Sequence, residues 1–273
     1  MSFQKIKRKP TLAEEVAENI KESILKGEYS PGTALPTEPK LSEQFGVSRA
    51  VIRDAVRIVS ALGLIDVQHG KGMFVTESLS DWFAGTLLTT LRKEGASVWD
   101  VEQFEELLYP QVFALAAENI LPENAQRLQS LCEKYIQHLT ELNRAYSNDQ
   151  QLPQAGKELE ERLRETSKEF FSIIFTASGN KLLRILGTST LHLRNFRFVE
   201  GTKEEEEKLL ALETEYFRKL TKSIVSSMPE EAAHLARRAY HHSPKMISEM
   251  RKTPIGEKPE IPFSEIIRAM DST

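Results

Sequence analysis

Three arginines at helical spacing are the side chains of this sequence best suited to bind an anion. Arg49, Arg53 and Arg57 follow Ser48, whose hydroxyl can cap the free backbone N–H groups of a helix start. An arginine near the start of a helix in the DNA major groove can chelate guanine, and the free N–H groups suit a phosphate. The alternative is a solvated arginine face on an ordinary surface helix.

The elements around these arginines favour the DNA-binding alternative. An apolar stripe at helical spacing leaves the arginines on another face of their helix, and it comprises Val51, Ile52, Ala55, Ile58, Val59 and Leu62. A first amphipathic helix follows a capping box of Thr11 and Glu14, and a short second helix ends at Gly46. Strands over Leu64–Gln68 and Met73–Val75 flank the tip His69-Gly70-Lys71-Gly72. The pattern predicts a winged helix-turn-helix.

The stretch from Ile24 to Val75 resembles the N-terminal domain of the GntR family of bacterial transcription regulators. The resemblance is carried by the turn, helix and wing signals in the family's order. It implies DNA contacts from Thr37, Ser48, Arg49, Arg53, His69, Gly70 and Lys71. One position departs from the family, which usually has arginine after the glutamate where this chain has Pro39. We expect one contact to be missing or supplied elsewhere.

Composition is consistent with a two-domain protein of the cytoplasm. The chain has 273 residues, 40% of them hydrophobic, with no apolar run of membrane-spanning length. The N-terminus lacks the apolar core of a signal peptide, and Cys132 is the single cysteine, so we expect a buried or bystander thiol and no internal disulfide.

Charge is unevenly distributed along the chain. Residues 1–76 carry 11 basic and 9 acidic side chains, whereas the remainder carries 25 and 31. Lys5, Lys7, Arg8 and Lys9 form a basic arm that either follows the DNA backbone or serves as a solubilising tail. Only the first part of the chain suits a polyanionic partner.

We predict a mainly α protein with a winged domain over residues 1–76, a linker over 77–80 and an all-α bundle over 81–273. The bundle helices are expected over 82–93, 98–119, 122–144, 156–177, 181–198, 203–226, 229–251 and 264–270. A polar stretch over 146–155 is expected to be a loop.

The Ala177-Ser178-Gly179-Asn180 element resembles the C-terminal ligand-sensing (FCD) domain of the FadR branch of that family. In many members this all-helical domain holds a divalent metal through one aspartate and three histidines, and the metal binds a carboxylate effector. At the first two ligand positions this chain reads Ser167 and Phe171. The next histidine position falls on Tyr216-Phe217, and the last falls near Ala239 or Tyr240.

These replacements predict a domain without a metal, because phenylalanine has no electron pair to donate. The usual arginine of the first domain helix is replaced by Glu105 or Glu106. The histidines that could in principle regroup are His138, His192, His234, His241 and His242. His234 and His241 are expected to share a helix face, although partly solvated surface is the simpler explanation.

An apolar, aromatic effector site is the expected replacement. The residues assigned to it are Phe171, Arg194, Phe217, Tyr240 and Ser243, within a wider set that includes Phe170, Ile174, Phe196, Phe198, Tyr216, Arg197, Arg237 and Arg238. The acyl-CoA-responsive FadR regulators are similar in lacking the metal ligands, which implies an acyl-CoA or fatty acid as effector. No cofactor and no membrane partner are expected.

The sequence therefore predicts a homodimeric, effector-controlled regulator that binds a palindromic site in double-stranded DNA. A metal-dependent carboxylate sensor and an effector-independent DNA-binding dimer remain alternatives. An enzyme is disfavoured because no nucleophile and base, and no metal constellation, can be assembled from the sequence.

Overall fold

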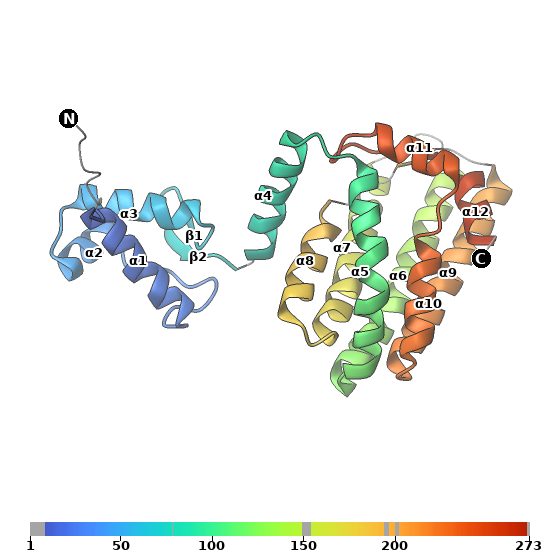
Figure 1. The fold of residues 1–273 in the computed structure, drawn as a ribbon, viewed down its shortest axis with the longest axis horizontal. Coiled ribbons are helices and arrows are strands. Elements are labelled where there is room, and N and C mark those ends of the chain that lie inside the picture. The colour runs from blue at the N-terminus through green and yellow to red at the C-terminus, as the bar shows by residue number, and fades with distance from the viewer. Residues whose placement is uncertain (1–8, 78, 149–153, 194–196, 200–201, 272–273) are drawn as a thin grey trace, which may run out of the picture. The chain divides into compact units, whose positions relative to one another are not determined.

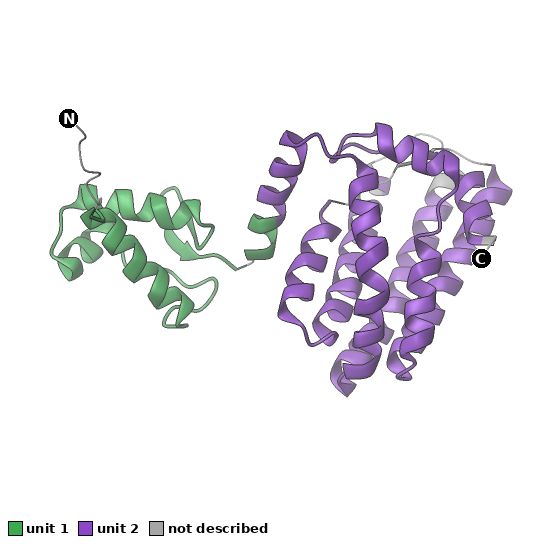
Figure 2. Ribbon diagram, in the orientation of Figure 1, with its two compact units in different colours: residues 1–83 green, residues 84–273 purple. Residues whose placement is uncertain are grey.

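A computed structural model describes residues 9–77, 79–148, 154–193, 197–199 and 202–271 (Figure 1). The chain divides into two compact units, residues 1–83 and 84–273 (Figure 2). The basic arm of Lys5, Lys7 and Arg8 lies outside the described residues. Among the residues that are described, no helix is both long and apolar enough to cross a bilayer.

The first unit is a winged helix-turn-helix, as predicted. It contains α1 (Leu12–Leu25), α2 (Glu38–Phe45), α3 (Arg49–Ala61), β1 (Ile65–Gln68) and β2 (Gly72–Val75). The strands pair antiparallel, with Ile65 opposite Val75 and Gln68 opposite Gly72. Apolar residues from all five elements form one core, among them Val16, Ile20, Leu41, Ile52, Val59, Ile65 and Met73.

The buried face of α3 differs from the predicted stripe. Ile52, Ala55, Val56 and Val59 are buried, whereas Ile58 and Leu62 are 36% and 46% exposed. Val56 lies one turn from Ile52 and Val59, so it completes the inward stripe at 3.6 residues per turn. The buried stripe is therefore displaced around the helix relative to the predicted one: it includes Val56 and leaves out Ile58 and Leu62.

Two of the glycines with positive φ in this unit lie on either side of α3. Gly46 (φ 65°) ends α2 and makes the tight turn into α3. Gly63 (φ 74°) follows α3, and a Cβ there would lie 2.3 Å from the Trp82 ring. The sequence signals did not reveal that residues 32–35 pair with β2, where Leu35 N–H donates to the Met73 carbonyl at 2.8 Å.

The second unit is a helical bundle. Its helices are α4 (Leu79–Lys93, which begins in the first unit), α5 (Val98–Asn119), α6 (Pro122–Asn148), α7 (Gln154–Ala177), α8 (Lys181–Leu191), α9 (Lys203–Val225), α10 (Pro229–Ala239), α11 (Pro244–Lys252) and α12 (Phe263–Asp271). α5 packs on α7 and α10, and α6 packs on α7 and α9 (Figure 1). The long helices therefore surround one shared interior.

Several predicted boundaries of this unit were wrong. The helix expected over 181–198 ends at Leu191, and β3 (Arg197–Val199) pairs parallel with β4 (Glu260–Pro262), so the domain is not entirely α. α4 begins at Leu79, inside the stretch expected to be a linker, and α6 extends to Asn148. Residues 149–153 of the expected loop lie outside the described residues.

The helix expected over 229–251 is divided into α10 and α11. Ser243 caps α11 and Pro244 is its first residue, and Pro244 has no N–H with which to continue the hydrogen-bond pattern of α10. The four residues from Tyr240 to Ser243 are consequently released from helical geometry.

Aromatic side chains fill the bundle interior. Phe170 and Phe113 are fully buried, and Tyr135 stacks on Phe217 with ring centroids 4.0 Å apart. Cys132 lies within this core, where burial raises the pKa of its thiol. Of the buried or bystander thiol expected from the sequence, Cys132 is the buried one.

Candidate DNA interface and ligand cavity

The exposed start of α3 is the strongest candidate for an anion-binding surface. The Ser48 hydroxyl accepts a hydrogen bond from Val51 N–H at 3.4 Å and so caps the helix. Arg49 is the first helical residue, and Arg53 follows one turn later on the same side; both are exposed. No acidic side chain pairs with either arginine in the described part of the chain, whereas Arg57 pairs with Asp54 at 3.2 Å. Arg49 and Arg53 are thus available to an external anion.

The wing offers a second exposed group of predicted residues. His69, Gly70 and Lys71 join β1 to β2, and Lys71 N–H closes the turn on the Gln68 carbonyl at 3.0 Å. Gly70 has a φ of 75°, which a glycine adopts without strain. All three residues are exposed, so the turn holds a lysine and a histidine clear of the core.

Thr37 and Pro39 lie at the start of α2. Thr37 is exposed at the N-cap position, and its side chain makes no capping hydrogen bond there. Pro39 occupies the first turn of α2 and is exposed, with Lys40 exposed beside it. The position where the resemblance predicts an arginine therefore presents no cation, and Lys40 is the adjacent basic residue.

Lys71→Ala is expected to weaken binding to all DNA sequences about equally. If Lys71 meets one phosphate, its loss should reduce the slope of log affinity against log salt by about 1. Lys26→Ala is the matched control, because Lys26 pairs with Glu22 at 2.9 Å on α1. Fluorescence anisotropy over a salt series measures both slopes. If the slope of log affinity against log salt is the same for Lys71→Ala as for Lys26→Ala, Lys71 does not contact a phosphate.

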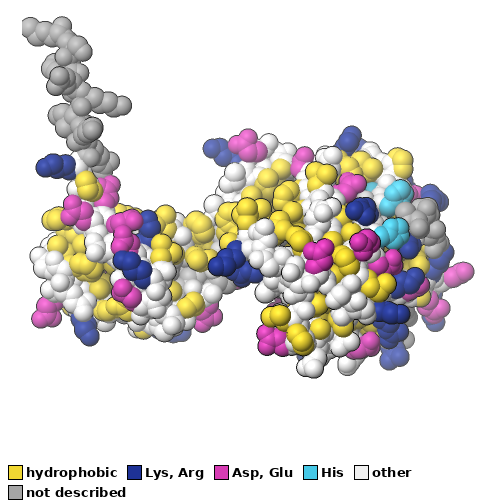
Figure 3. All heavy atoms as spheres, turned by 60° about the horizontal axis from the view of Figure 1, so that its bottom comes forward, with side chains coloured by type: hydrophobic (Ala, Val, Ile, Leu, Met, Phe, Trp, Pro, Cys, Tyr) yellow, Lys and Arg dark blue, Asp and Glu magenta, His cyan; other side chains and the backbone are white. Residues whose placement is uncertain are grey.

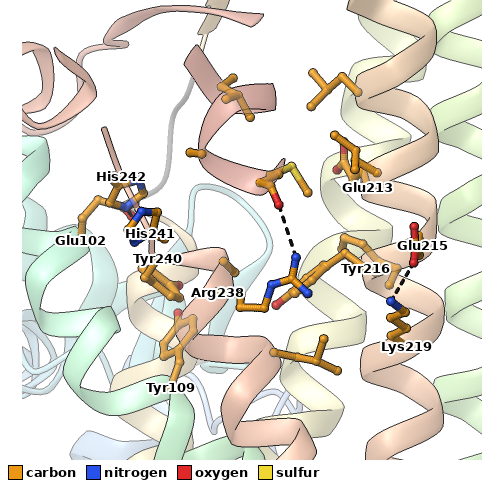
Figure 4. A pocket seen from close by; sticks show the side chains of 18 of the residues that line it. Glu102, Tyr109, Glu213, Glu215, Tyr216, Lys219, Arg238, Tyr240, His241 and His242 are labelled. Atoms are coloured by element: carbon orange, nitrogen blue, oxygen red, sulfur yellow. Dashed lines mark hydrogen bonds and ion pairs between the residues drawn. The ribbon is translucent and has the colours of Figure 1, made fainter. Parts of the chain in front are cut away.

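The helical domain contains a partly open cavity of about 330 Å³. Its walls come from α5, α6, α7, α9, α10, α11, α12 and the segment after α10 (Figure 4). The aromatic part of the wall comprises Tyr109, Phe113, Tyr135, Phe171, Tyr216, Phe217 and Tyr240. The charged and basic part comprises Glu102, Glu213, Glu215, Lys219, Arg238, His241 and His242. The wall is more strongly charged than the apolar site that the sequence predicted.

The structure brings three of the five predicted effector residues to this cavity. Phe171, Phe217 and Tyr240 line it, and Arg238 of the wider set does so too. Ser243 does not line it; its hydroxyl caps α11 and donates to Glu265 at 2.7 Å. Phe170 is buried in the core instead, and Arg237 is exposed. Arg194 and Phe196 lie outside the described residues.

The residues at the expected metal-ligand positions converge but do not fit a metal. Ser167, Phe171, Phe217 and Tyr240 all line the one cavity. Two of them are phenyl rings, which cannot coordinate a cation through a lone pair. The described residues also contain no group of three or more His, Cys, Asp or Glu side chains placed to hold an ion. The cavity therefore lies where the resemblance predicts the effector site, but its side chains cannot supply the set of ligands that a metal needs.

A buried polar network behind the cavity was missed by the sequence reasoning. Glu105 is fully buried and accepts from Tyr109 OH at 3.0 Å and from Tyr240 OH at 2.8 Å. The Tyr109 hydroxyl also lies 3.0 Å from Thr190 Oγ1. The network joins α5, α8 and the end of α10. Its sequence signal was the acidic residue at Glu105 or Glu106, and the structure buries Glu105 while Glu106 is exposed.

A second buried pair lies one turn earlier on α5. Glu102 Oε2 lies 3.0 Å from His242 Nε2, and the two side chains are 4% and 9% exposed. The other ring nitrogen of His242 is buried and has no hydrogen-bond partner among the described residues. The pair fixes the segment after α10 against α5.

Comparisons with known proteins agree with this architecture. Residues 12–75 match the family model described as "Bacterial regulatory proteins, gntR family". The HTH-type transcriptional regulator Mce2R of Mycobacterium tuberculosis (strain CDC 1551 / Oshkosh) is 36% identical over 135 residues, which are 47% of this chain and 55% of Mce2R. The uncharacterised HTH-type transcriptional regulator YieP of Escherichia coli (strain K12) is 46% identical over 65 residues, 24% of this chain and 28% of YieP. The matches cover about half the length of the first of these relatives.

A solved structure of Streptococcus agalactiae GntR has the same fold. It superposes with a TM-score of 0.55 at 21% identity, over 88% of this chain and 100% of that one. At this identity the likeness concerns the fold alone. The named relatives are regulators rather than enzymes.

Proposed function

Because residues 12–75 form a winged helix-turn-helix domain of the GntR family, we propose that the protein is a sequence-specific DNA-binding transcription regulator of the bacterial cytoplasm. One observation carries the proposal. Arg49 and Arg53 project from the capped start of α3 with no acidic partner in the described part of the chain. In this geometry Arg49 and Arg53 read base edges, Thr37, Ser48 and Lys71 contact phosphates, and the wing at His69-Gly70 lies along the backbone or minor groove.

We propose that the regulator is a homodimer on a palindromic operator. One recognition helix reads only a few base pairs, so two helices about one DNA turn apart are needed for useful specificity. Leu107 on α5 is 79% exposed and Leu182 on α8 is 63% exposed, and Phe104 and Ile185 are exposed on the same two helices. α5 and α8 are in contact, which makes these residues a candidate self-association face. Figure 3 shows hydrophobic side chains gathered on one face of the helical domain.

The cavity supports an effector-controlled regulator over an effector-independent one. Its volume of about 330 Å³ lies near the lower end of the roughly 300–1,000 Å³ typical of small-molecule sites. This size favours a compact effector over a whole long-chain acyl-CoA. A short fatty acid is small enough to be tested as a ligand. The mismatched metal-ligand positions disfavour a metal-dependent carboxylate sensor.

Selection of binding sites from random duplex DNA by the purified full-length protein tests the regulator proposal. We expect enrichment of a two-fold symmetric site, bound by two copies of the chain in native mass spectrometry. Denaturing extraction and metal analysis of the same sample then report any bound small molecule or stoichiometric metal. Failure to enrich any sequence would contradict the proposal, and a stoichiometric metal would restore the carboxylate-sensor alternative.

A further inference from the structure

Glu213 is the carboxyl group of the cavity wall that lacks a basic partner. One of its oxygens accepts a hydrogen bond from Tyr135 OH, and no basic side chain among the described residues pairs with it. The other cavity acids are compensated. Glu102 lies against His242, and Glu215 pairs with Lys219 at 2.7 Å. A carboxylate recessed in a cavity without a counter-charge is costly unless a ligand supplies one.

Three basic groups of the wall are already engaged, and one of them is His242, which lies against Glu102. Lys219 forms its ion pair at the rim with Glu215, where both side chains are more than half exposed. The Arg238 guanidinium donates to the Met270 carbonyl of α12 at 3.3 Å (Figure 4). Arg238 also interacts electrostatically with Glu215. Among the described residues the wall therefore has an unmatched acid in Glu213, whereas its lysine and its arginine are both engaged; the exposed His241 also lines the cavity.

An aromatic cluster of the cavity wall reaches this acid through Tyr135. Tyr135 holds the Glu213 carboxyl and stacks on Phe217, whose ring centroid lies 5.7 Å from that of Tyr216. An ammonium group is attracted both to a carboxylate and to the faces of aromatic rings, and the attraction grows when water is excluded. A carboxylate ligand would be repelled by Glu213 at the same place.

We propose that the cavity binds a compact organic cation, a protonated amine with an apolar body, through an ion pair with Glu213 beside Tyr135, Tyr216 and Phe217. The proposal rests on the effector role assigned to the cavity above, and it specifies the chemical class of the effector. It reverses the charge of ligand expected for a metal-dependent carboxylate sensor. A cavity of about 330 Å³ accommodates an amine of roughly ten non-hydrogen atoms.

Three matched probes separate the possible ligand classes. Phenethylamine, 3-phenylpropionate and 2-phenylethanol share an aromatic body and differ in a positive, negative or neutral end. Octanoate tests the fatty-acid alternative. Binding to the full-length protein is measured by isothermal titration calorimetry and by thermal stabilisation, without DNA. We expect stabilisation by phenethylamine, and little by the neutral and anionic probes.

Variants connect the binding to Glu213. Glu213→Gln keeps the shape and the hydrogen bond from Tyr135 but removes the charge, so amine affinity should fall at least about tenfold. Glu207→Gln is the matched control, because it removes a charge from an exposed position on α9 outside the cavity. It should leave amine affinity unchanged. Far-UV circular dichroism and the melting temperature of each variant confirm that it is folded.

The pH dependence gives an independent test. Burial raises the pKa of Glu213, so its carboxylate forms at a higher pH than usual, while an alkylamine stays protonated below pH ~9. Amine affinity should therefore increase as the pH rises through the pKa of Glu213. The other titratable and charged groups around the cavity are Glu102 and Tyr109 on α5, Tyr135 on α6, Glu215, Tyr216 and Lys219 on α9, Arg238 on α10, and Tyr240, His241 and His242 after it. Any dependence of amine affinity on pH that remains in Glu213→Gln must come from these other groups.

The outcomes are decisive in both directions. Amine binding that Glu213→Gln weakens and Glu207→Gln preserves supports the proposal. Preferential binding of 3-phenylpropionate or octanoate overturns it, as does the absence of stabilisation by the amine. Because none of these assays contains DNA, the regulator proposal stands or falls separately in the operator selection.

Discussion

Arg49→Ala is expected to weaken binding to the selected operator by about 1–3 kcal/mol, roughly 5- to 150-fold, and to change binding to unrelated DNA far less. The reason is geometric, since a guanidinium at the first residue of a recognition helix can donate two parallel hydrogen bonds to one guanine. Arg49→Lys keeps the charge but loses the fork, so it should also lose most of the discrimination. Competition anisotropy with operator and scrambled duplexes measures both affinities.

Arg57→Ala is the matched control for this prediction. Arg57 lies two turns further along α3 and pairs with Asp54, so its loss should cost little specific binding. By contrast Lys7→Ala, in the basic arm outside the described residues, should lower specific and non-specific binding about equally. Equal losses of specific and non-specific binding from Arg49→Ala would show that Arg49 contacts only phosphate.

The second large effect is expected in stability. Glu105→Ala should lower the free energy of unfolding of the helical domain by about 2–5 kcal/mol, because it opens a cavity and removes the acceptor of two buried tyrosine hydroxyls. The Tyr109 hydroxyl retains Thr190 Oγ1 as a neighbour at 3.0 Å. Urea unfolding of the full-length protein, followed by circular dichroism, gives the change.

Glu106→Ala provides the control at the next position. Glu106 is exposed on the same helix, and substitutions at such sites usually alter stability by less than about 0.5 kcal/mol. Similar midpoints for the two variants would mean that Glu105 is not needed to hold α5 against the end of α10. A large loss confined to Glu105→Ala would establish the network as a structural tie beneath the cavity.

The winged domain was predictable because its signals are local. Ser48 as a cap, Gly46 as a turn and the alternation around the wing tip each depend on a few neighbouring residues, and the structure places them as expected. The exposure of Ile58 and Leu62 was not predictable in the same way. Which edge of an apolar stripe is covered depends on the neighbouring elements rather than on the helix itself.

The helical domain was predicted in outline but not in detail. The convergence of Phe171, Phe217 and Tyr240 on one cavity followed from the resemblance, because the positions of a bundle interior are kept when side chains change. The acids at Glu102, Glu105 and Glu213 were not recognised as interior, since an acidic residue on a helix is usually solvated. Their burial depends on partners up to 140 positions away, such as His242 for Glu102.

The interruption between α10 and α11 gives this site a capacity for change that a continuous helix would lack. Tyr240, His241 and His242 all line the cavity, and they lie between the last residue of α10 and the Ser243 cap of α11. The backbone of these residues lies outside the regular hydrogen-bond pattern of α10 and α11. Tyr240 and His242 are held by Glu105 and Glu102, so His241 is the exposed position of this segment where a substitution can alter the cavity wall without breaking a buried contact.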